Sequence, residues 1–199
     1  MAATEDRVRI FESTVLSDDW YTLKEVTFDF LRRDGTWQCQ SSETFDLGNG
    51  ATILLHNRHT GNVVLTRQCR MPMFVNGHDG IVIEAAAGLL DNATPEERIR
   101  LKAEEETGYR VSNIRKVFEA CMSPGSVTEK LYFYLGDYDA SMCVNEGVGV
   151  EDEGEDLEVL EMPFWTDLKI VKSGKIVDGK TIMLLQHLAL SEIAEGCRA

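Results

Sequence analysis

The sequence has 199 residues, of which 43% are hydrophobic and 27% are charged, a composition typical of a folded domain rather than a disordered or fibrous chain. A chain of this length buries roughly 70% of its unfolded surface, so folding requires neither disulfides nor a structural metal. Acidic residues outnumber basic residues by 34 to 20, which gives a net charge of −14. This excess argues against a nucleic-acid partner, because phosphate neutralisation requires clustered Lys and Arg.

The first 46 residues predict a small β region. Residues rich in β-forming side chains favour strands, and Arg33-Asp34-Gly35 predicts a hairpin turn. Gly48-Asn49-Gly50 then separates this segment from the remainder. We therefore expect an N-terminal β region at residues 1–46 and a main α/β domain at residues 47–199. Strands are expected at 8–16, 20–31 and 36–45.

The main domain mixes strands with helices. Turn signals at residues 59–62 predict a second hairpin. A short helix is expected at residues 164–172, and an amphipathic helix at residues 181–194 closes the chain. This mixture predicts an α/β fold. Its strands are expected at 51–56, 63–68, 81–86, 111–119, 130–138 and 157–162.

Residues 91–109 predict the most informative helix. Thr94, Pro95 and Glu97 supply an N-cap, a proline in the first helical position and the acid of a capping box. Gly108 is placed to end the helix as a C′ glycine. The helix therefore has a clear start signal and a clear stop signal.

Three successive glutamates, residues 104–106, lie near the end of this helix, where each opposes the helix dipole at a cost of roughly 0.3–1 kcal/mol. Residues three and four apart share a helix face, so position 102 stands beside the last two of them. Carboxylates there, with a carbonyl of Ala87 or Gly88, offer oxygen ligands suited to Mg²⁺. A solvated acidic helix end is the alternative, and charge alone does not separate the two.

Residues 88–109 resemble the Nudix box, and the matching positions are Gly88, Glu105, Glu106, Gly108 and Tyr109. The box is one residue shorter than its commonest form. With similarity along almost the whole chain, this shortening resembles the bacterial GDP-mannose pyrophosphatase branch of the Nudix hydrolases, near the ADP-ribose pyrophosphatases. Further matches are residues 16–18, 46–52, 67–70, 87–92, 122–129, 151–153, 158–161 and 178–181.

The resemblance implies a Nudix α/β/α sandwich with a mixed sheet and an N-terminal β-strand extension used for homodimerisation. It implies Mg²⁺-dependent hydrolysis, with Mn²⁺ as a further candidate ion, of the pyrophosphate bond of a nucleotide sugar. GDP-mannose would give GMP and mannose 1-phosphate. Two alternatives stay open: ADP-ribose as the substrate, and a non-catalytic Nudix domain that binds a nucleotide sugar.

The resemblance also implies roles for particular residues. The metal ligands would be the Ala87 carbonyl and the carboxylates of Glu105, Glu106 and a loop acid, either Glu153 or Glu155, with Glu155 preferred. The loop acid would bind the metal or orient the attacking water, so the expected catalytic residues are these four glutamates. A solvated acidic loop is the alternative.

The expected substrate contacts come from both regions of the chain. Arg70 would clamp a phosphate, because a planar guanidinium fits phosphate oxygens. Lys180 would add positive charge at the nucleotide sugar, and Trp20 would stack on the nucleobase across the homodimer, unless it is a core or hairpin tryptophan. The full expected set is Trp20, Ser41, Ser42, Glu43, Arg70, Ala87, Gly88, Leu89, Glu129 and Lys180.

One residue departs from the resemblance. Where the Nudix box carries a metal-binding glutamate, this chain has Lys102, and Arg100 stands near the position of a lost arginine. We hypothesise that the ammonium of Lys102 pairs with Glu105 or Glu106, competes with Mg²⁺ and lowers activity. The alternative is that its flexible stem turns to solvent.

The remaining signals concern the compartment. The five cysteines are scattered and contain no Cys-x-x-Cys pair, so we expect reduced thiols in the cytoplasm. Residues 1–9 have no apolar segment, and we expect no signal peptide. The longest apolar run, residues 85–90, is far shorter than the ~20 residues of a membrane span, so no membrane partner is expected.

Overall fold

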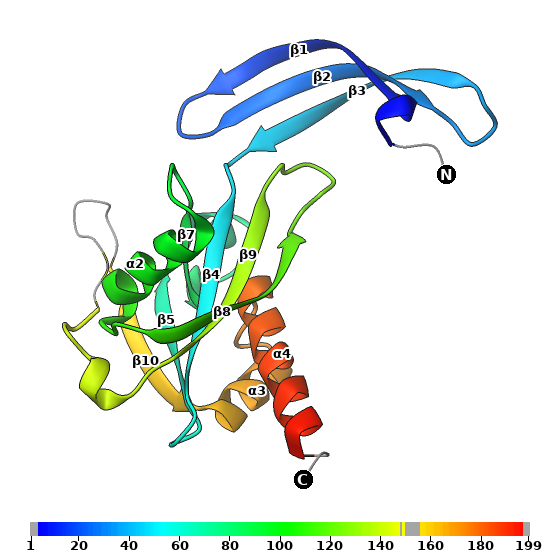
Figure 1. The fold of residues 1–199 in the computed structure, drawn as a ribbon. Helices are drawn as coiled ribbons and strands as arrows, with labels where there is room; N and C mark the ends of the chain where they lie inside the picture. The colour runs from blue at the N-terminus through cyan, green and yellow to red at the C-terminus, as the bar shows by residue number, and fades with distance from the viewer. Residues whose placement is uncertain (1–3, 148, 150–155, 197–199) are drawn as a thin grey trace. The chain divides into compact units, whose positions relative to one another are not determined.

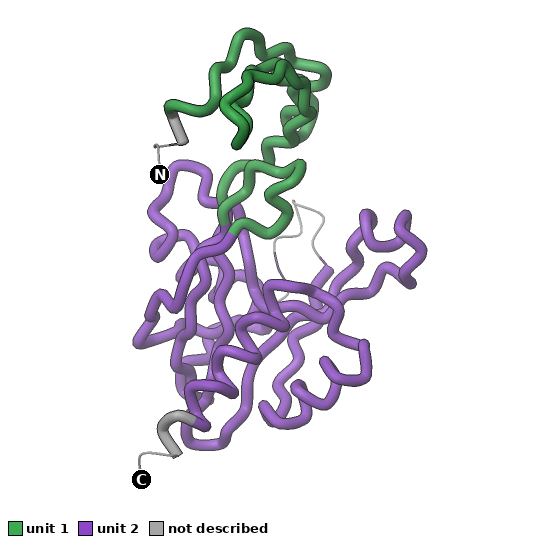
Figure 2. The backbone as a smooth tube through the Cα atoms, turned by 90° about the vertical axis from the view of Figure 1, so that its right-hand side faces the viewer, with its two compact units in different colours: residues 1–49, 121–130 green, residues 50–120, 131–199 purple. Residues whose placement is uncertain are grey.

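The computed structural model describes residues 4–147, 149 and 156–196. The chain divides into two compact units (Figure 2). Unit 1 comprises residues 1–49 and 121–130, and unit 2 comprises residues 50–120 and 131–199. Unit 1 thus includes a segment from the middle of the chain that the expected region 1–46 leaves out.

Unit 1 is built on a three-stranded antiparallel sheet, in which β2 lies between β1 and β3 (Figure 1). The predicted turn joins β2 to β3. There the Arg32 N–H donates to the Thr36 carbonyl at 2.8 Å, and Gly35 has a φ of 82°, which a residue without a Cβ adopts easily. The strands are β1 Val8–Asp18, β2 Thr22–Leu31 and β3 Trp37–Asp46, preceded by a 3₁₀ turn at Thr4–Arg7.

The segment 121–130 attaches to the end of β3 through main-chain hydrogen bonds. The Phe45 N–H donates to the Ser126 carbonyl at 2.8 Å, and the Thr128 N–H donates to the Phe45 carbonyl at 3.1 Å. The Thr128 hydroxyl also donates to Asp46 at 3.0 Å. None of the described residues of unit 1 is buried, so this unit has no hydrophobic core of its own.

Unit 2 contains a mixed seven-stranded sheet with the order β10-β5-β4-β9-β8, in which β6 pairs with β5 and β7 pairs with β4. The β4–β9 pair is parallel, whereas β4 pairs antiparallel with β5 and β7. The predicted mixed sheet is therefore confirmed. The strands are β4 Gly50–Asn57, β5 Asn62–Cys69, β6 Ile81–Glu84, β7 Ala86–Leu89, β8 Ser112–Cys121, β9 Lys130–Asp137 and β10 Glu158–Pro163.

Helices cover both faces of this sheet (Figure 1). All of β4 is buried, and its alternate residues Ala51 and Ile53 share a core cluster with Ile99 of α2. On the other face, the His56 ring lies 6.4 Å from Phe164 of α3, and its Nε2 lies 3.6 Å from Glu192 of α4. This confirms the predicted α/β/α sandwich.

The three predicted helices are present as α2 Pro95–Thr107, α3 Phe164–Lys172 and α4 Gly179–Gly196. A fourth helix, α1 Met71–Val75, was not predicted, because five residues are too few to show helical periodicity. None of the described helices has the length and apolar character needed to cross a membrane.

Asp167, in the first turn of α3, is an unusual core residue. Its side chain is fully buried, and within the described part of the chain neither carboxylate oxygen has a hydrogen-bond partner. Burial raises its pKa from 3.8 to about 7, because ionisation would leave an uncompensated charge in the core. Between about pH 4 and 7 the native state therefore keeps a proton on Asp167 that the unfolded chain releases.

We expect Asp167→Asn to change how stability depends on pH. Between about pH 4 and 7 only the native state holds the proton, so the unfolding free energy falls as pH rises, by about 1.4 kcal/mol per pH unit. The amide cannot ionise, so the variant should gain stability relative to the parent chain at pH 8 but not at pH 4. Urea denaturation at both pH values measures this difference. An equal change at the two pH values would contradict it.

Candidate active site

The junction between β7 and α2 is fixed by local structure. The β4 ladder places Thr52 opposite Ala87 and Ala51 opposite Gly88. The capping box at the start of α2 is confirmed, with Thr94 and Glu97 exchanging hydrogen bonds. These contacts fix the position of β7 against β4 and the residue at which α2 begins.

Gly108 ends α2 in the left-handed region, with a φ of 77°. A Cβ there would lie 2.2 Å from the Asn145 carbonyl oxygen, so only glycine fits. The predicted stop signal is therefore confirmed.

The three successive glutamates of α2 point in different directions. Glu104 forms a two-pronged surface pair with Arg110, at 3.1 and 3.0 Å, which holds the pKa of Glu104 below its usual value. Glu105 pairs with Lys102, whose Nζ lies 3.3 Å from Oε2. Glu106 is 2% exposed and accepts a hydrogen bond of 3.3 Å from the Ala87 N–H. Glu104 thus belongs to the surface, whereas Glu106 reaches the predicted site strand.

Lys102 is buried, with only 3% of its surface exposed. Its stem packs against Gly88, where an added Cβ would lie 2.7 Å from Lys102 Cγ. The alternative in which this stem turns to solvent is therefore wrong, and of the two hypothesised partners, Glu105 and Glu106, the pairing with Glu105 is present. Gly88 is needed here because a side chain would collide with Lys102.

The expected metal ligands are only partly brought together. Ala87 and Glu106 meet through a hydrogen bond, and Glu105 lies beside a lysine ammonium. Glu153 and Glu155 lie outside the described residues. Across residues 4–147, 149 and 156–196, no group of three or more His, Cys, Asp or Glu is placed to hold a metal ion.

A second cluster joins two of the predicted substrate contacts. Arg70, directly after β5, and Lys180, in the first turn of α4, both bind Glu84 at the end of β6. The Arg70 Nε lies 2.7 Å from Glu84 Oε1, and Lys180 Nζ also lies 2.9 Å from Asp178. Glu84 is 3% exposed. One buried carboxylate therefore holds both cations.

Glu84, Arg70 and Lys180 each keep their charge in this cluster. Burial alone would raise the pKa of Glu84, but Lys180 and Arg70 outweigh it and hold that pKa below its usual value. Burial alone would lower the pKa of Lys180 and of Arg70, but Glu84 raises both. The charge of Glu106 also raises the pKa of Arg70, so the two clusters interact electrostatically.

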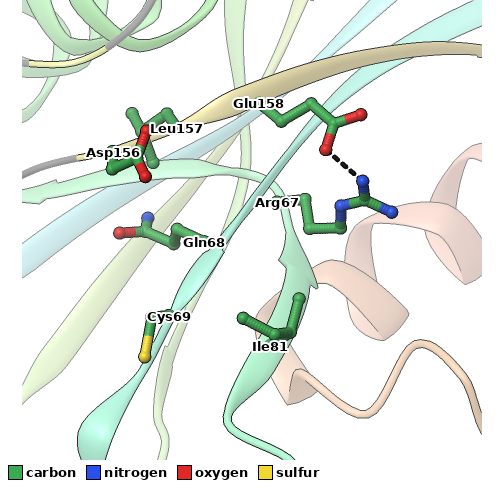
Figure 3. A pocket seen from close by; sticks show the side chains of 7 residues that line it. All are labelled: Arg67, Gln68, Cys69, Ile81, Asp156, Leu157 and Glu158. Carbon is green, nitrogen blue, oxygen red and sulfur yellow. Dashed lines mark hydrogen bonds and ion pairs between the residues drawn. The ribbon is translucent and has the colours of Figure 1, made fainter.

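The cluster lines a small pocket of about 270 Å³, whose apolar wall includes Met73, Val82 and Val177. A larger pocket of about 520 Å³ lies between β5, β6 and β10 and contains none of the predicted site residues (Figure 3). Within the larger pocket, Arg67 is paired with Glu158. Of these two pockets among the described residues, the smaller one coincides with the sequence prediction.

Sequence reasoning missed three residues of these clusters. Glu84 interrupts an apolar strand, and a buried acid in such a strand is the signal that could have identified it. Asp178 stands two residues before Lys180. Arg98 of α2 donates to the Leu89 carbonyl at 2.8 Å and thereby links α2 to β7. Arg100, which stands near the position of the lost Nudix-box arginine, instead donates to the Val111 carbonyl at 3.3 Å.

The other predicted substrate contacts lie in unit 1. Trp20 is 86% exposed in the hairpin turn between β1 and β2, so it is a hairpin tryptophan and not a core one, and its ring lies edge-on to Tyr21 at 6.4 Å. Ser41, Ser42 and Glu43 lie on β3, and Glu129 lies in the segment 121–130. The predicted residues therefore form two groups, one in each unit.

We expect Glu84→Gln to destabilise the fold by about 3 kcal/mol, because it leaves two cations against a neutral amide. Glu158→Gln is the matched control, since it breaks an Arg–Glu pair whose side chains are 44% and 53% exposed. That change should cost less than about 1 kcal/mol. Urea denaturation of both variants measures the contrast, and equal losses would show that the cluster is not a buried ion-pair centre.

Comparison with known proteins places the chain among enzymes. The sequence model of the GDP-mannose pyrophosphatase NudK N-terminal domain matches residues 7–45. A GDP-mannose pyrophosphatase of Pectobacterium atrosepticum is 53% identical over 181 residues, which cover 90% of this chain and 93% of that protein. One from Escherichia coli O1:K1 is 47% identical over 190 residues, covering 95% and 98%.

A crystal structure of an ADP compounds hydrolase has the same fold, with a TM-score of 0.74 over 96% of both chains at 14% identity. The sandwich and the N-terminal sheet thus occur together in a solved structure as well. The near-complete coverage of the curated relatives, at about half of all positions identical, shows that the chain belongs to the GDP-mannose pyrophosphatase family of the Nudix hydrolases.

Proposed function

We propose that the protein hydrolyses the pyrophosphate bond of GDP-mannose, giving GMP and mannose 1-phosphate. The observation that carries this proposal is the pair of cations, Arg70 and Lys180, held on buried Glu84 in a family whose relatives bear that activity in their names. A diphosphate carries negative charge on both phosphates, and two fixed cations suit it.

The roles of the chain's own residues follow from this proposal. Arg70 and Lys180 bind diphosphate oxygens, and Glu84 and Asp178 orient them. The main chain of residues 87–89, fixed by the β4 ladder, borders the bound sugar nucleotide. Trp20, Ser41, Ser42, Glu43 and Glu129 stay predicted substrate contacts.

Nudix hydrolases generally use a divalent metal ion. The described donors do not fit a resident divalent site, because the ammonium of Lys102 lies against Glu105 and no further acid joins Glu105 and Glu106. We propose that Mg²⁺, or alternatively Mn²⁺, accompanies the substrate, since Mg²⁺ binds through one or two carboxylates plus substrate phosphates. The roles of Glu153 and Glu155 as loop acids stay predictions.

We expect Lys180→Met to raise the KM for GDP-mannose about tenfold to 100-fold, because a charge-assisted hydrogen bond contributes roughly 1.5–3 kcal/mol. Lys175→Met, at an exposed position just before the same helix, is the control and should leave KM unchanged.

Turnover of GDP-mannose and ADP-ribose, measured side by side, tests which nucleotide sugar is the preferred substrate. Equal or greater turnover of ADP-ribose would refute GDP-mannose as the preferred substrate.

A second function is favoured by one observation, the Lys102–Glu105 pair. A Nudix domain with a lysine against its acidic face could bind a nucleotide sugar without cleaving it. Thermal stabilisation by GDP-mannose without release of GMP, at any Mg²⁺ concentration, would support binding over hydrolysis.

We also propose that the protein is a homodimer formed through unit 1. The supporting observation is the three-stranded sheet, in which no described residue is buried, since apolar side chains on such a sheet gain stability only when another surface covers them. Its exposed apolar side chains include Phe11 and Leu16, at 62% and 49% exposure. Both fall at register shifts of β1, where β-bulges redirect side chains. A second copy of the same apolar surface is the simplest cover.

The double variant Phe11→Asp/Leu16→Asp should weaken this dimer about 100-fold or more, because each lost apolar side chain contributes roughly 1.5–3 kcal/mol. Thr14→Asp adds a charge to the same strand at an exposed polar position and serves as the control. Sedimentation velocity over a concentration series gives the dissociation constants. A parent chain that stays monomeric at all concentrations would refute the dimer.

The cytoplasm is the compartment we propose. Cys39, Cys69, Cys121 and Cys143 are exposed and free of disulfides, and such thiols persist in reducing compartments.

A further inference from the structure

We propose that the ammonium of Lys102 is a built-in cation that takes the place of one divalent metal ion, so that the substrate-free protein binds no divalent cation at Glu105. The role of this cation in hydrolysis rests on the proposed function. The lack of divalent-cation binding at Glu105 is a property of the substrate-free protein and does not depend on that function.

The first support is geometric. Lys102 is 3% exposed, and its Nζ lies 3.3 Å from Glu105 Oε2. Its stem fills the space beside Gly88, with an added Cβ only 2.7 Å from Cγ. The charged group is therefore not a mobile surface ammonium that a metal ion could displace at little cost. It is packed between α2 and β7.

The second support is the chemistry of the donors. An ammonium has three N–H donors and no lone pair, so it occupies the space beside a carboxylate without being a ligand. Glu105 already has this positive partner, and a divalent ion bound to the same carboxylate would face direct repulsion from it. Mg²⁺ and Ca²⁺ sites are built from oxygen ligands. In the described part of the chain no third acid completes such a set.

The third support is the position of the cation. The N–H of Ala87 in β7 donates a hydrogen bond to Glu106, and the negative charge of Glu106 raises the pKa of Arg70. Lys102 and Arg70 are therefore cations on either side of Ala87 and Glu106 in the sequence of contacts: Lys102 pairs with the neighbouring Glu105, and Arg70 is affected by the charge of Glu106. A diphosphate bound there would meet fixed positive charge without a resident metal.

The test is a Mn²⁺ titration of the full chain without nucleotide, followed by electron paramagnetic resonance of the free ion. The parent chain should show no saturable binding up to millimolar Mn²⁺. Lys102→Glu should bind Mn²⁺ about 100-fold more tightly or better, because it exchanges a repelling charge for a ligand.

Lys116→Glu is the matched control. It makes the same charge change at an exposed Lys–Glu pair of the same spacing, in which Nζ and Glu119 Oε2 are 2.9 Å apart. Its Mn²⁺ affinity should equal that of the parent chain. If Lys116→Glu binds as tightly as Lys102→Glu, net charge and not the position of Lys102 decides the affinity, and the proposal is overturned.

Three carboxylates together could prevent Lys102→Glu from folding without metal. Lys102→Met then replaces it, since it keeps an apolar stem and removes only the charge. It should bind Mn²⁺ at least about tenfold more tightly than the parent chain. Tight Mn²⁺ binding by the parent chain, equal to that of either variant, overturns the proposal.

The failure of the proposed function looks different. A parent chain that cleaves no nucleotide sugar, while the titrations behave as described, refutes hydrolysis and leaves the built-in cation intact. A parent chain that cleaves GDP-mannose and also binds Mn²⁺ tightly without nucleotide refutes only the built-in cation.

Discussion

The candidate site depends on one buried carboxylate, that of Glu84. It stands at the end of β6, where it receives Arg70 from the end of β5 and Lys180 from the start of α4. Three elements separated along the chain are thus joined by charge at one point. Removing any partner would leave an uncompensated charge beside the buried Glu84, which is why such clusters act as rigid centres.

The acidic helix α2 acts on this arrangement through Glu106, whose charge raises the pKa of Arg70. Its capping box and its terminal glycine fix the helix ends, and the rotation between successive residues then sends Glu104 outward while Glu106 turns toward β7. The cations of the candidate site, Arg70, Lys180 and Lys102, are therefore each paired with a carboxylate. An incoming diphosphate competes with carboxylates for cations that are already ordered, so little side-chain entropy is lost on binding.

Local signals in the sequence were sufficient for α2 and for the hairpin at Gly35, because their determinants lie within a few residues of one another. The pairing of Lys102 with Glu105 was predictable for the same reason, since helical spacing of three residues brings side chains together. Glu84 was not predictable in this way. Its partner Lys180 is 96 residues away, and only the folded sheet brings them together.

The attachment of residues 121–130 to unit 1 could not be predicted from the sequence either. It uses main-chain hydrogen bonds, which any sequence can make, so no residue type marks it. The Lys102 stem beside Gly88 is a further case. The sequence was compatible with a stem turned to solvent and with an ion pair, and the packing of the stem against Gly88 in the folded chain separates the two.

The contact between Gly88 and Lys102 has an evolutionary consequence. A glutamate is shorter than a lysine, so the space beneath the glycine would accept it without moving β7, and a single nucleotide substitution converts a lysine codon into a glutamate codon. Lineages could therefore exchange the two residues in either direction with no second mutation to repair packing. Any larger residue at position 88 would prevent this exchange, because its side chain would collide with the side chain at position 102.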